Sequence, residues 1–149
     1  MKKIGLTLVF SFCAAIWIVR AEPPDPDWKT DFAAARAVAA KEHRKMLVVF
    51  LNSESCFYSQ RFQKDVLNQN KFAKYIRLNK FVLVYLDFPR RGQVPAANLA
   101  AAAGFGVKTY PTSLLLNDSG KLLGAVIGTT SLDNFTRKLD EILQKASDK

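Results

Sequence analysis

The sequence predicts an α/β fold in which helices flank a central mixed β-sheet and the chain ends with a β-hairpin and a helix. Two continuous apolar runs, 46–51 (MLVVFL) and 81–86 (FVLVYL), are typical of strands covered on both faces. A third strand-like run, 112–116 (TSLLL), precedes turn residues and another apolar segment. Alternating helices and strands that end in a hairpin favour a mixed sheet between helical layers. The 149 residues support one such domain.

The N-terminal half is predicted to contain three helices and the first strand. Residues 28–44 form an Ala-rich helix that Asp27 can cap, with Trp28, Phe32 and Ala35 or Ala39 near one face. Polar residues 52–55 end the strand 46–51, and Cys56 then opens a helix that runs to residue 67. A shorter helix covers residues 69–78.

The C-terminal half is predicted to contain two helices and the remaining strands. Asp87 closes the strand 81–86, and a loop leads to a helix over 95–103 with proline in its first turn. The turn 117–120 (NDSG) joins the strand 112–116 to its hairpin partner, 121–127. The last helix has one apolar face and is capped by Thr130 with Asp133 or by Ser131 with Asn134.

The first 21 residues are predicted to be a secretory signal peptide. A basic start, an apolar run over 4–19 and Ala21 before the Pro-rich segment 22–27 fit this class of leader. The apolar run falls short of the roughly 20 residues that a membrane-spanning helix needs. We therefore expect cleavage after Ala21 and an exported mature domain, residues 22–149, in the periplasm or secreted. The alternative is an uncleaved membrane anchor.

The charge of the chain excludes little apart from nucleic-acid binding. Loss of the leader lowers the net charge from +9 to +6, because Lys2, Lys3 and Arg20 leave with it. The remaining cations are scattered and form no stripe interleaved with aromatic residues, so we expect no nucleic-acid partner. A basic surface of this kind favours weak attraction to acidic partners.

The cysteine count points to one residue. The chain has two cysteines, and Cys13 lies in the leader, so the mature protein keeps Cys56 alone and forms no intrachain disulfide. A single cysteine in an exported protein is inert, is bonded to another molecule or is a free reactive thiol. One cysteine and the one histidine, His43, cannot supply a structural zinc site, and the sequence indicates no other cofactor.

The predicted position of Cys56 favours the reactive thiol. It follows a buried strand and begins a helix, where unpaired N–H groups stabilise an anion such as a thiolate. A thiol with a pKa of about 8.5 is about 3% ionised at neutral pH, whereas a pKa of about 6 makes it about 90% ionised. Arg61 and Lys64 follow in the same helix, but exposed charges at that range contribute little.

The residues around Cys56 and Tyr110-Pro111 together resemble the thioredoxin superfamily. The resemblance rests on an apolar strand, a polar turn, Cys56 and a helix, followed by Gly-Val-Lys-Thr-Tyr-Pro-Thr at 106–112 and the hairpin, and it spans residues 28–143. It implies a thioredoxin-like fold and places Cys56 as the nucleophilic cysteine. It also implies that Tyr110-Pro111 is the cis-proline loop, which lies against that cysteine and pairs with the substrate backbone.

The departures from the family pattern imply restricted chemistry. Ser59 stands where the dithiol members have a resolving cysteine, Ser55 replaces the usual tryptophan and Phe50 replaces a buried acid. The resemblance therefore implies a monothiol protein that forms mixed disulfides with protein or small-molecule thiols and disulfides. Cys56 and Ser59 are then the catalytic candidates, and Tyr110, Pro111 and an apolar lip of Phe57 and Tyr58 the substrate-binding ones.

Bland alternatives accompany these assignments. In the main alternative, Cys56 is an unreactive relic. The groove expected between its helix and Tyr110-Pro111 then holds peptide or protein partners without covalent chemistry. One of Phe57 and Tyr58 is expected to be an ordinary core residue. His43 is expected to be a surface residue at the end of the first helix rather than a partner of Cys56.

Overall fold

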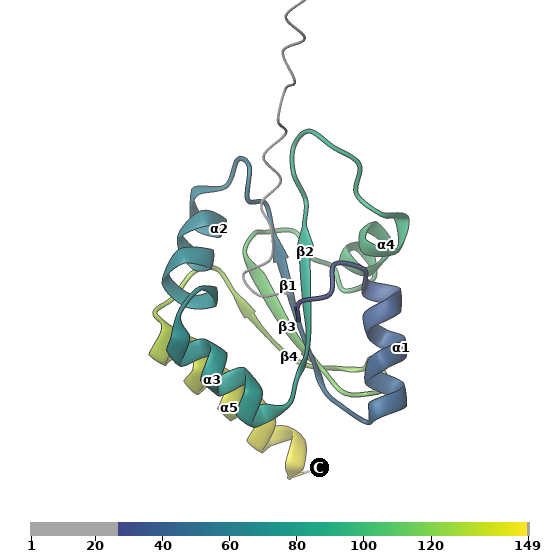
Figure 1. Cartoon of the computed structure of the whole chain (residues 1–149), viewed down its shortest axis with the longest axis vertical. Helices are drawn as coiled ribbons and strands as arrows, with labels where there is room; N and C mark the ends of the chain where they lie inside the picture. Colours follow the sequence, from purple (N-terminus) through teal and green to yellow (C-terminus); the bar gives the residue numbers. More distant parts are fainter. Residues whose placement is uncertain (1–26, 149) are drawn as a thin grey trace, which may run out of the picture.

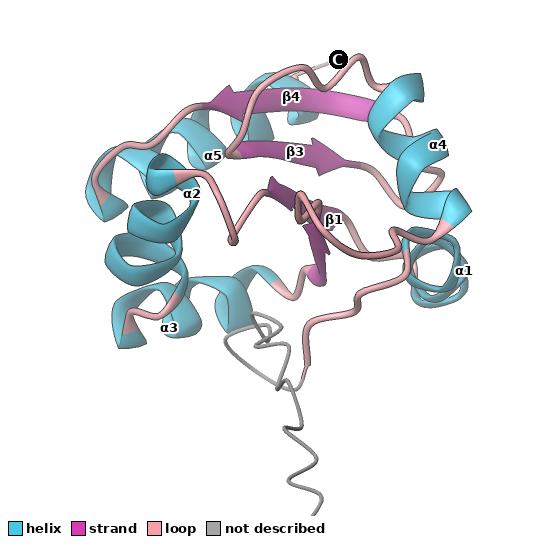
Figure 2. Cartoon of the chain, turned by 90° about the horizontal axis from the view of Figure 1, so that it is seen from above, coloured by secondary structure: helices cyan, strands magenta, loops and turns pink. Residues whose placement is uncertain are grey.

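The computed structural model describes residues 27–148, so the predicted signal peptide, residues 1–21, lies outside the described residues. It confirms an α/β fold with a four-stranded mixed sheet in the order β2-β1-β3-β4. Helices α2 (Phe57–Phe62), α3 (Asn70–Asn79) and α5 (Leu132–Ser147) cover one face of this sheet, and α1 (Phe32–Glu42) and α4 (Ala96–Gly104) cover the other (Figure 1; Figure 2). The strands are β1 (Met46–Leu51), β2 (Val82–Asp87), β3 (Thr112–Leu116) and β4 (Leu122–Ile127).

The apolar strands form the centre of two hydrophobic layers. β1 pairs parallel with β2 and antiparallel with β3, and β3 pairs antiparallel with β4. Because successive side chains of a strand point to opposite faces, Leu47, Val49 and Leu51 join the core under α2, α3 and α5, whereas alternate residues such as Val48 join the core under α1 and α4. Every residue of β1 is buried, as its uninterrupted apolar run predicts.

The first helix begins later than predicted. α1 (Phe32–Glu42) is capped by the side chain of Asp31, which accepts a hydrogen bond from the N–H of Ala34, so the predicted cap at Asp27 is wrong. The preceding residues are extended instead, and Lys29 forms a parallel bridge to Val84 of β2. Lys29 forms two backbone hydrogen bonds with the outer strand β2, and these outweigh the helix propensity of this segment. Trp28 is buried beside that edge rather than on a helix face.

The predicted helix 56–67 is interrupted. It consists of α2 (Phe57–Phe62) and a π-helical segment η1 (Gln63–Leu67), in which the N–H of Asn68 bonds the carbonyl of Gln63. This change in winding buries both Val66 and Leu67. The other helices lie within one residue of their predicted bounds at most starts and ends; they are α3 (Asn70–Asn79), α4 (Ala96–Gly104) and α5 (Leu132–Ser147).

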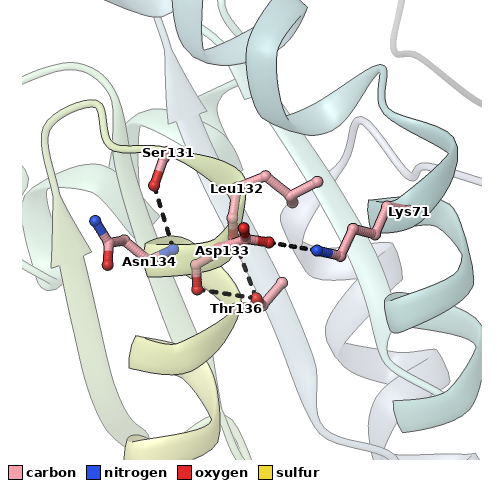
Figure 3. Close-up of polar contacts among 6 residues, drawn as sticks. All are labelled: Lys71, Ser131, Leu132, Asp133, Asn134 and Thr136. Carbon is pink, nitrogen blue, oxygen red and sulfur yellow. Dashed lines mark hydrogen bonds and ion pairs between the residues drawn. The ribbon is translucent and has the colours of Figure 1, made fainter.

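The start of α5 uses the second of its two predicted caps. Figure 3 shows the Ser131 hydroxyl accepting a hydrogen bond from the N–H of Asn134, at 3.4 Å. The hydroxyl of Thr136 donates to the carbonyls of Leu132 and Asp133. The carboxylate of Asp133 also forms an ion pair with Lys71 of α3, which links the two helices at the surface.

The topology gathers four connections at one edge of the sheet. Leu51 pairs with Asp87, Phe50 with Thr112, and Thr112 with Ile127. The ends of β1, β2 and β4 and the start of β3 therefore lie side by side, and the connections that follow or precede them meet there. Within residues 27–148, no helix combines the length and apolar character that crossing a membrane requires.

Candidate functional site

Cys56 lies at this edge as the N-cap residue of α2. Its backbone is extended, with φ −109° and ψ 106°, and its carbonyl accepts the N–H of Gln60, 3.1 Å away. The thiol is free and partly exposed. The predicted position after a buried strand and at a helix start is therefore confirmed, and the sulfur is not sealed in the core.

Hydrogen bonds brace the turn that presents the sulfur. The side-chain oxygen of Asn52 accepts from the N–H and the hydroxyl of Ser55, at 3.0 and 2.8 Å. Asp87, at the end of β2, accepts from the N–H and the hydroxyl of Ser53, at 2.9 and 2.6 Å. The Gln60 amide donates to the Ser53 carbonyl at 2.9 Å. The turn is thus held both to the neighbouring strand and to the first turn of α2.

Ser59 points inward, one helical turn after Cys56. It is 0% exposed, and its hydroxyl oxygen accepts the N–H of Asn52 at 3.1 Å. The same hydroxyl also forms a side-chain hydrogen bond with the Cys56 sulfur, which acts to lower the pKa of that thiol. Ser59 therefore connects the turn and the sulfur.

The pKa of the Cys56 thiol reflects opposing effects. Burial is the largest of them and raises the pKa, but hydrogen bonds from the Ser59 hydroxyl and from the N–H groups of Ser59 and Tyr58 together outweigh it. The pKa of Cys56 is consequently lower than that of an ordinary cysteine. Neither Arg61 nor Lys64 contributes to this shift, and Arg61 is paired with Asp65 at 3.2 Å.

Tyr110 and Pro111 lie against the sulfur. The Tyr110–Pro111 peptide bond is cis, and the Cys56 thiol donates to the carbonyl of Tyr110 at 3.5 Å. The carbonyl of Pro111 accepts the N–H of Gly128 at 2.9 Å, which joins this loop to the end of β4. The ring of Tyr110 stacks on Phe88, with centroids 5.6 Å apart. The fold therefore brings together two segments that are 54 residues apart in the chain.

Two further predictions have different outcomes. Phe57 and Tyr58 are 67% and 59% exposed, so the expectation that one of them is a core residue is wrong. Their rings contact each other edge to face, and the inward positions of α2 belong to Ser59 and Phe62. His43 is exposed at the C-terminus of α1 and faces Asp118 at 3.4 Å, as expected for a surface residue.

Sequence reasoning missed Asn52 and Asp87 as supports of the site. Asp87 directly follows a buried strand that is parallel to β1, and the carboxyl ends of neighbouring parallel strands share one sheet edge. That signal predicts proximity to the Cys56 turn, but the contact to Ser53 depends on a register that the sequence does not specify. Among the described residues, no group of three or more His, Cys, Asp or Glu side chains is arranged to hold a metal ion.

Residues 32–143 match the family of thioredoxin-like domains. The chain belongs to this family. The match covers both Cys56 and the Tyr110-Pro111 loop, so the geometry described above is that of a thioredoxin-like domain. No curated protein sequence gives a significant match.

Solved structures share the fold at low sequence identity. DsbH oxidoreductase matches with a TM-score of 0.70 and 20% identity, over 78% of this chain and 83% of that one. The oxidised DsbD C-terminal domain of Neisseria meningitidis matches with a TM-score of 0.61 and 17% identity, over 76% and 97%. A thioredoxin from Thermus thermophilus matches with a TM-score of 0.58 and 20% identity, over 78% and 85%. These similarities establish a common fold.

The thioredoxin-like domain presents a thiol with three hydrogen-bond donors and one acceptor around it. The donors stabilise the thiolate, whereas the Tyr110 carbonyl accepts from the neutral thiol. Phe50, at the position of the family's buried acid, is itself 0% exposed and stacks on Phe88. The site therefore favours ionisation of one sulfur without a carboxylate beneath it.

Proposed function

We propose that this thioredoxin-like protein carries out thiol–disulfide exchange through Cys56 as a monothiol. The observation that carries the proposal is the partly exposed sulfur of Cys56, which receives hydrogen bonds from the Ser59 hydroxyl and two backbone N–H groups. The thiolate is the reactive form of cysteine, so a lowered pKa increases the reactive fraction at neutral pH. The similar DsbH structure is named an oxidoreductase, and this chain belongs to the family of thioredoxin-like domains. Both observations agree with the proposed activity.

The reaction that this site supports is one exchange step. The Cys56 thiolate attacks one sulfur of a partner disulfide, a new sulfur–sulfur bond forms, and the partner's other sulfur leaves as a thiolate. Ser59 hydrogen-bonds the sulfur but has no thiol with which to release the bound partner. A second thiol, from the substrate or from a small molecule, completes the cycle, which favours isomerase-like or deglutathionylating activity.

The surface around the sulfur suits an extended partner. The exposed rings of Phe57 and Tyr58 follow Cys56 directly, and the Tyr110 carbonyl contacts its sulfur. We propose that the aromatic rings contact apolar side chains of the partner and that the loop contacts its backbone. Aromatic side chains in such positions bury large areas on binding.

We also propose that the domain acts after export. The leader-like residues 1–21 support this proposal, with the domain starting at residue 22. Mass spectrometry of the protein from the periplasm or medium of an expressing bacterium tests it. A mature N-terminus at Glu22 is the expected result, and an intact N-terminus on membrane-bound protein contradicts it.

The exchange activity is tested with hydroxyethyl disulfide and three variants. The wild-type protein is expected to gain one mixed disulfide at Cys56, which added glutathione removes, and Cys56→Ser is expected to gain none. Ser59→Cys places a second thiol within disulfide range of Cys56, so it should release the adduct unaided. Lys64→Cys, which adds a thiol further along the exposed surface, is the matched control and should not.

A folded protein whose Cys56 stays unmodified would exclude the exchange activity. In that case the surface beside Cys56 is left with the second function, noncovalent holding of peptides. The exposure of Phe57 and Tyr58 favours this second candidate, and Cys56→Ser would then bind partners as well as the wild type does.

A further inference from the structure

Three exposed cationic side chains lie at the same sheet edge as Cys56. Arg90 and Arg91 belong to the connection between β2 and α4, and Lys108 lies two residues before Tyr110. None of the three side chains takes part in an ion pair or side-chain hydrogen bond with another described residue. Their charges are thus available to a partner.

Specific contacts fix these segments beside the sulfur. The N–H of Arg91 donates to the carboxylate of Glu54 at 3.0 Å, and Glu54 is two residues before Cys56. The stacking of Phe88 on Tyr110 joins the same connection to the loop that contacts Cys56. Figure 1 shows the connection from β2 to α4 and the turn before α2 at one end of the molecule.

The local carboxylates cancel only part of this positive charge. Glu54 and Asp87 lie at this edge, and both accept hydrogen bonds from the protein itself, to Arg91 and Ser53 respectively. Arg61 and Asp65 neutralise each other nearby. Three cations and two carboxylates leave one net positive charge at this edge, so a partner that approaches the sulfur meets an excess of positive charge.

We propose that Arg90, Arg91 and Lys108 select disulfides that carry carboxylates next to the reacting sulfur. This inference rests on the proposed exchange activity and specifies its substrate class. Attraction between unlike charges raises the rate of encounter and weakens as salt screens it. Small acidic disulfides and cystines in acidic peptide segments share this chemistry. The exchange step itself is unchanged: the Cys56 sulfur bonds to one partner sulfur, and the other leaves as a thiolate.

The test compares reaction rates with disulfides of different charge. The probes are anionic dithiodiglycolate, neutral hydroxyethyl disulfide and cationic cystamine, with a matched pair of acidic and basic cystine peptides as a second arm. At low salt we expect the anionic probe to react at least about threefold faster than the cationic probe, after each is normalised to its rate with a free thiol of ordinary pKa. The ratio should approach one in about 0.5 M salt.

Charge-reversal variants test whether the rate preference depends on these three residues. Arg90→Glu, Arg91→Glu and Lys108→Glu combined should invert the ratio. The control combines Lys41→Glu, Lys45→Glu and Lys121→Glu, which change the net charge equally at the opposite sheet edge, where β1 and β4 begin. It should keep the preference.

The outcomes of this test separate the two proposals. A ratio near one in both arms with the wild type, or a ratio that the control lowers as much as the first variant, overturns the charge selection while the exchange activity stands. No reaction of Cys56 with the neutral disulfide overturns both. A preference in the peptide arm alone assigns the selection to protein substrates, and a preference in both arms includes small acidic disulfides.

Discussion

Replacement of Ser59 with alanine tests the physical basis of the reactive thiol. The hydroxyl donates one of the three hydrogen bonds that stabilise the Cys56 thiolate, and no other described side chain donates to that sulfur. Alanine removes it without adding volume to a residue that is fully buried. We therefore expect the pKa of Cys56 to rise.

The size of the rise follows from the strength of one hydrogen bond. A hydrogen bond to a charged group contributes about 1.5–3 kcal/mol. Sulfur is a weak acceptor and Cys56 is partly exposed, so water replaces part of the loss and about 1 kcal/mol remains. That corresponds to a pKa increase of about 0.7. At a pH below the pKa, the thiolate fraction and the alkylation rate fall about fivefold.

The assay is the pH dependence of iodoacetamide alkylation, followed by mass spectrometry. The wild-type protein should show an inflection below the ordinary cysteine value of about 8.5, and Ser59→Ala a higher one. Ser55→Ala is the control, because it removes a neighbouring hydroxyl that bonds Asn52 rather than the sulfur. An unchanged or lower inflection in Ser59→Ala, or an equal rise in Ser55→Ala, would refute this reasoning.

Three further substitutions test the scaffold, each by urea unfolding. Asp87→Asn should destabilise the protein by about 1–3 kcal/mol, because an amide oxygen cannot replace both carboxylate oxygens that accept from Ser53. A decrease in the free energy of unfolding of less than about 0.5 kcal/mol would contradict a stabilising role for these two hydrogen bonds. Asn98→Leu leaves the N–H of Phe32 and the carbonyl of Thr30 without their partners, so a loss of about 2 kcal/mol or more is expected, and unchanged stability would count against it. Gly124→Val places a Cβ 2.7 Å from Ile142 of α5, and overpacking of this kind destabilises by about 1–3 kcal/mol. Gly104→Ala, whose Cβ meets nothing within 4 Å, is its control and should be neutral or stabilising.

The sequence was sufficient to predict the sheet and its helices. The apolar run 46–51 and the strand-like run 112–116 give strands with the predicted bounds, because their apolar side chains are buried between two helical layers. The cap of α5 was narrowed to two candidates, Thr130 and Ser131, since capping depends on residues three apart in the chain, and the structure has Ser131. The placement of Cys56 after a buried strand followed from the same local rules.

Only the tertiary structure decided what surrounds the sulfur. The Tyr110 carbonyl 3.5 Å from Cys56 and the contact between Asp87 and Ser53 join residues that are distant in sequence. The cis bond at Tyr110–Pro111 was expected only from the family resemblance, because the dipeptide alone does not specify it. The late start of α1 also depends on a contact between distant residues. Lys29 bonds to the outer strand β2, and no local sequence pattern indicates this contact. Local sequence fixes how a segment prefers to fold, whereas strand register fixes which segments meet, and the chemistry of Cys56 depends on that meeting.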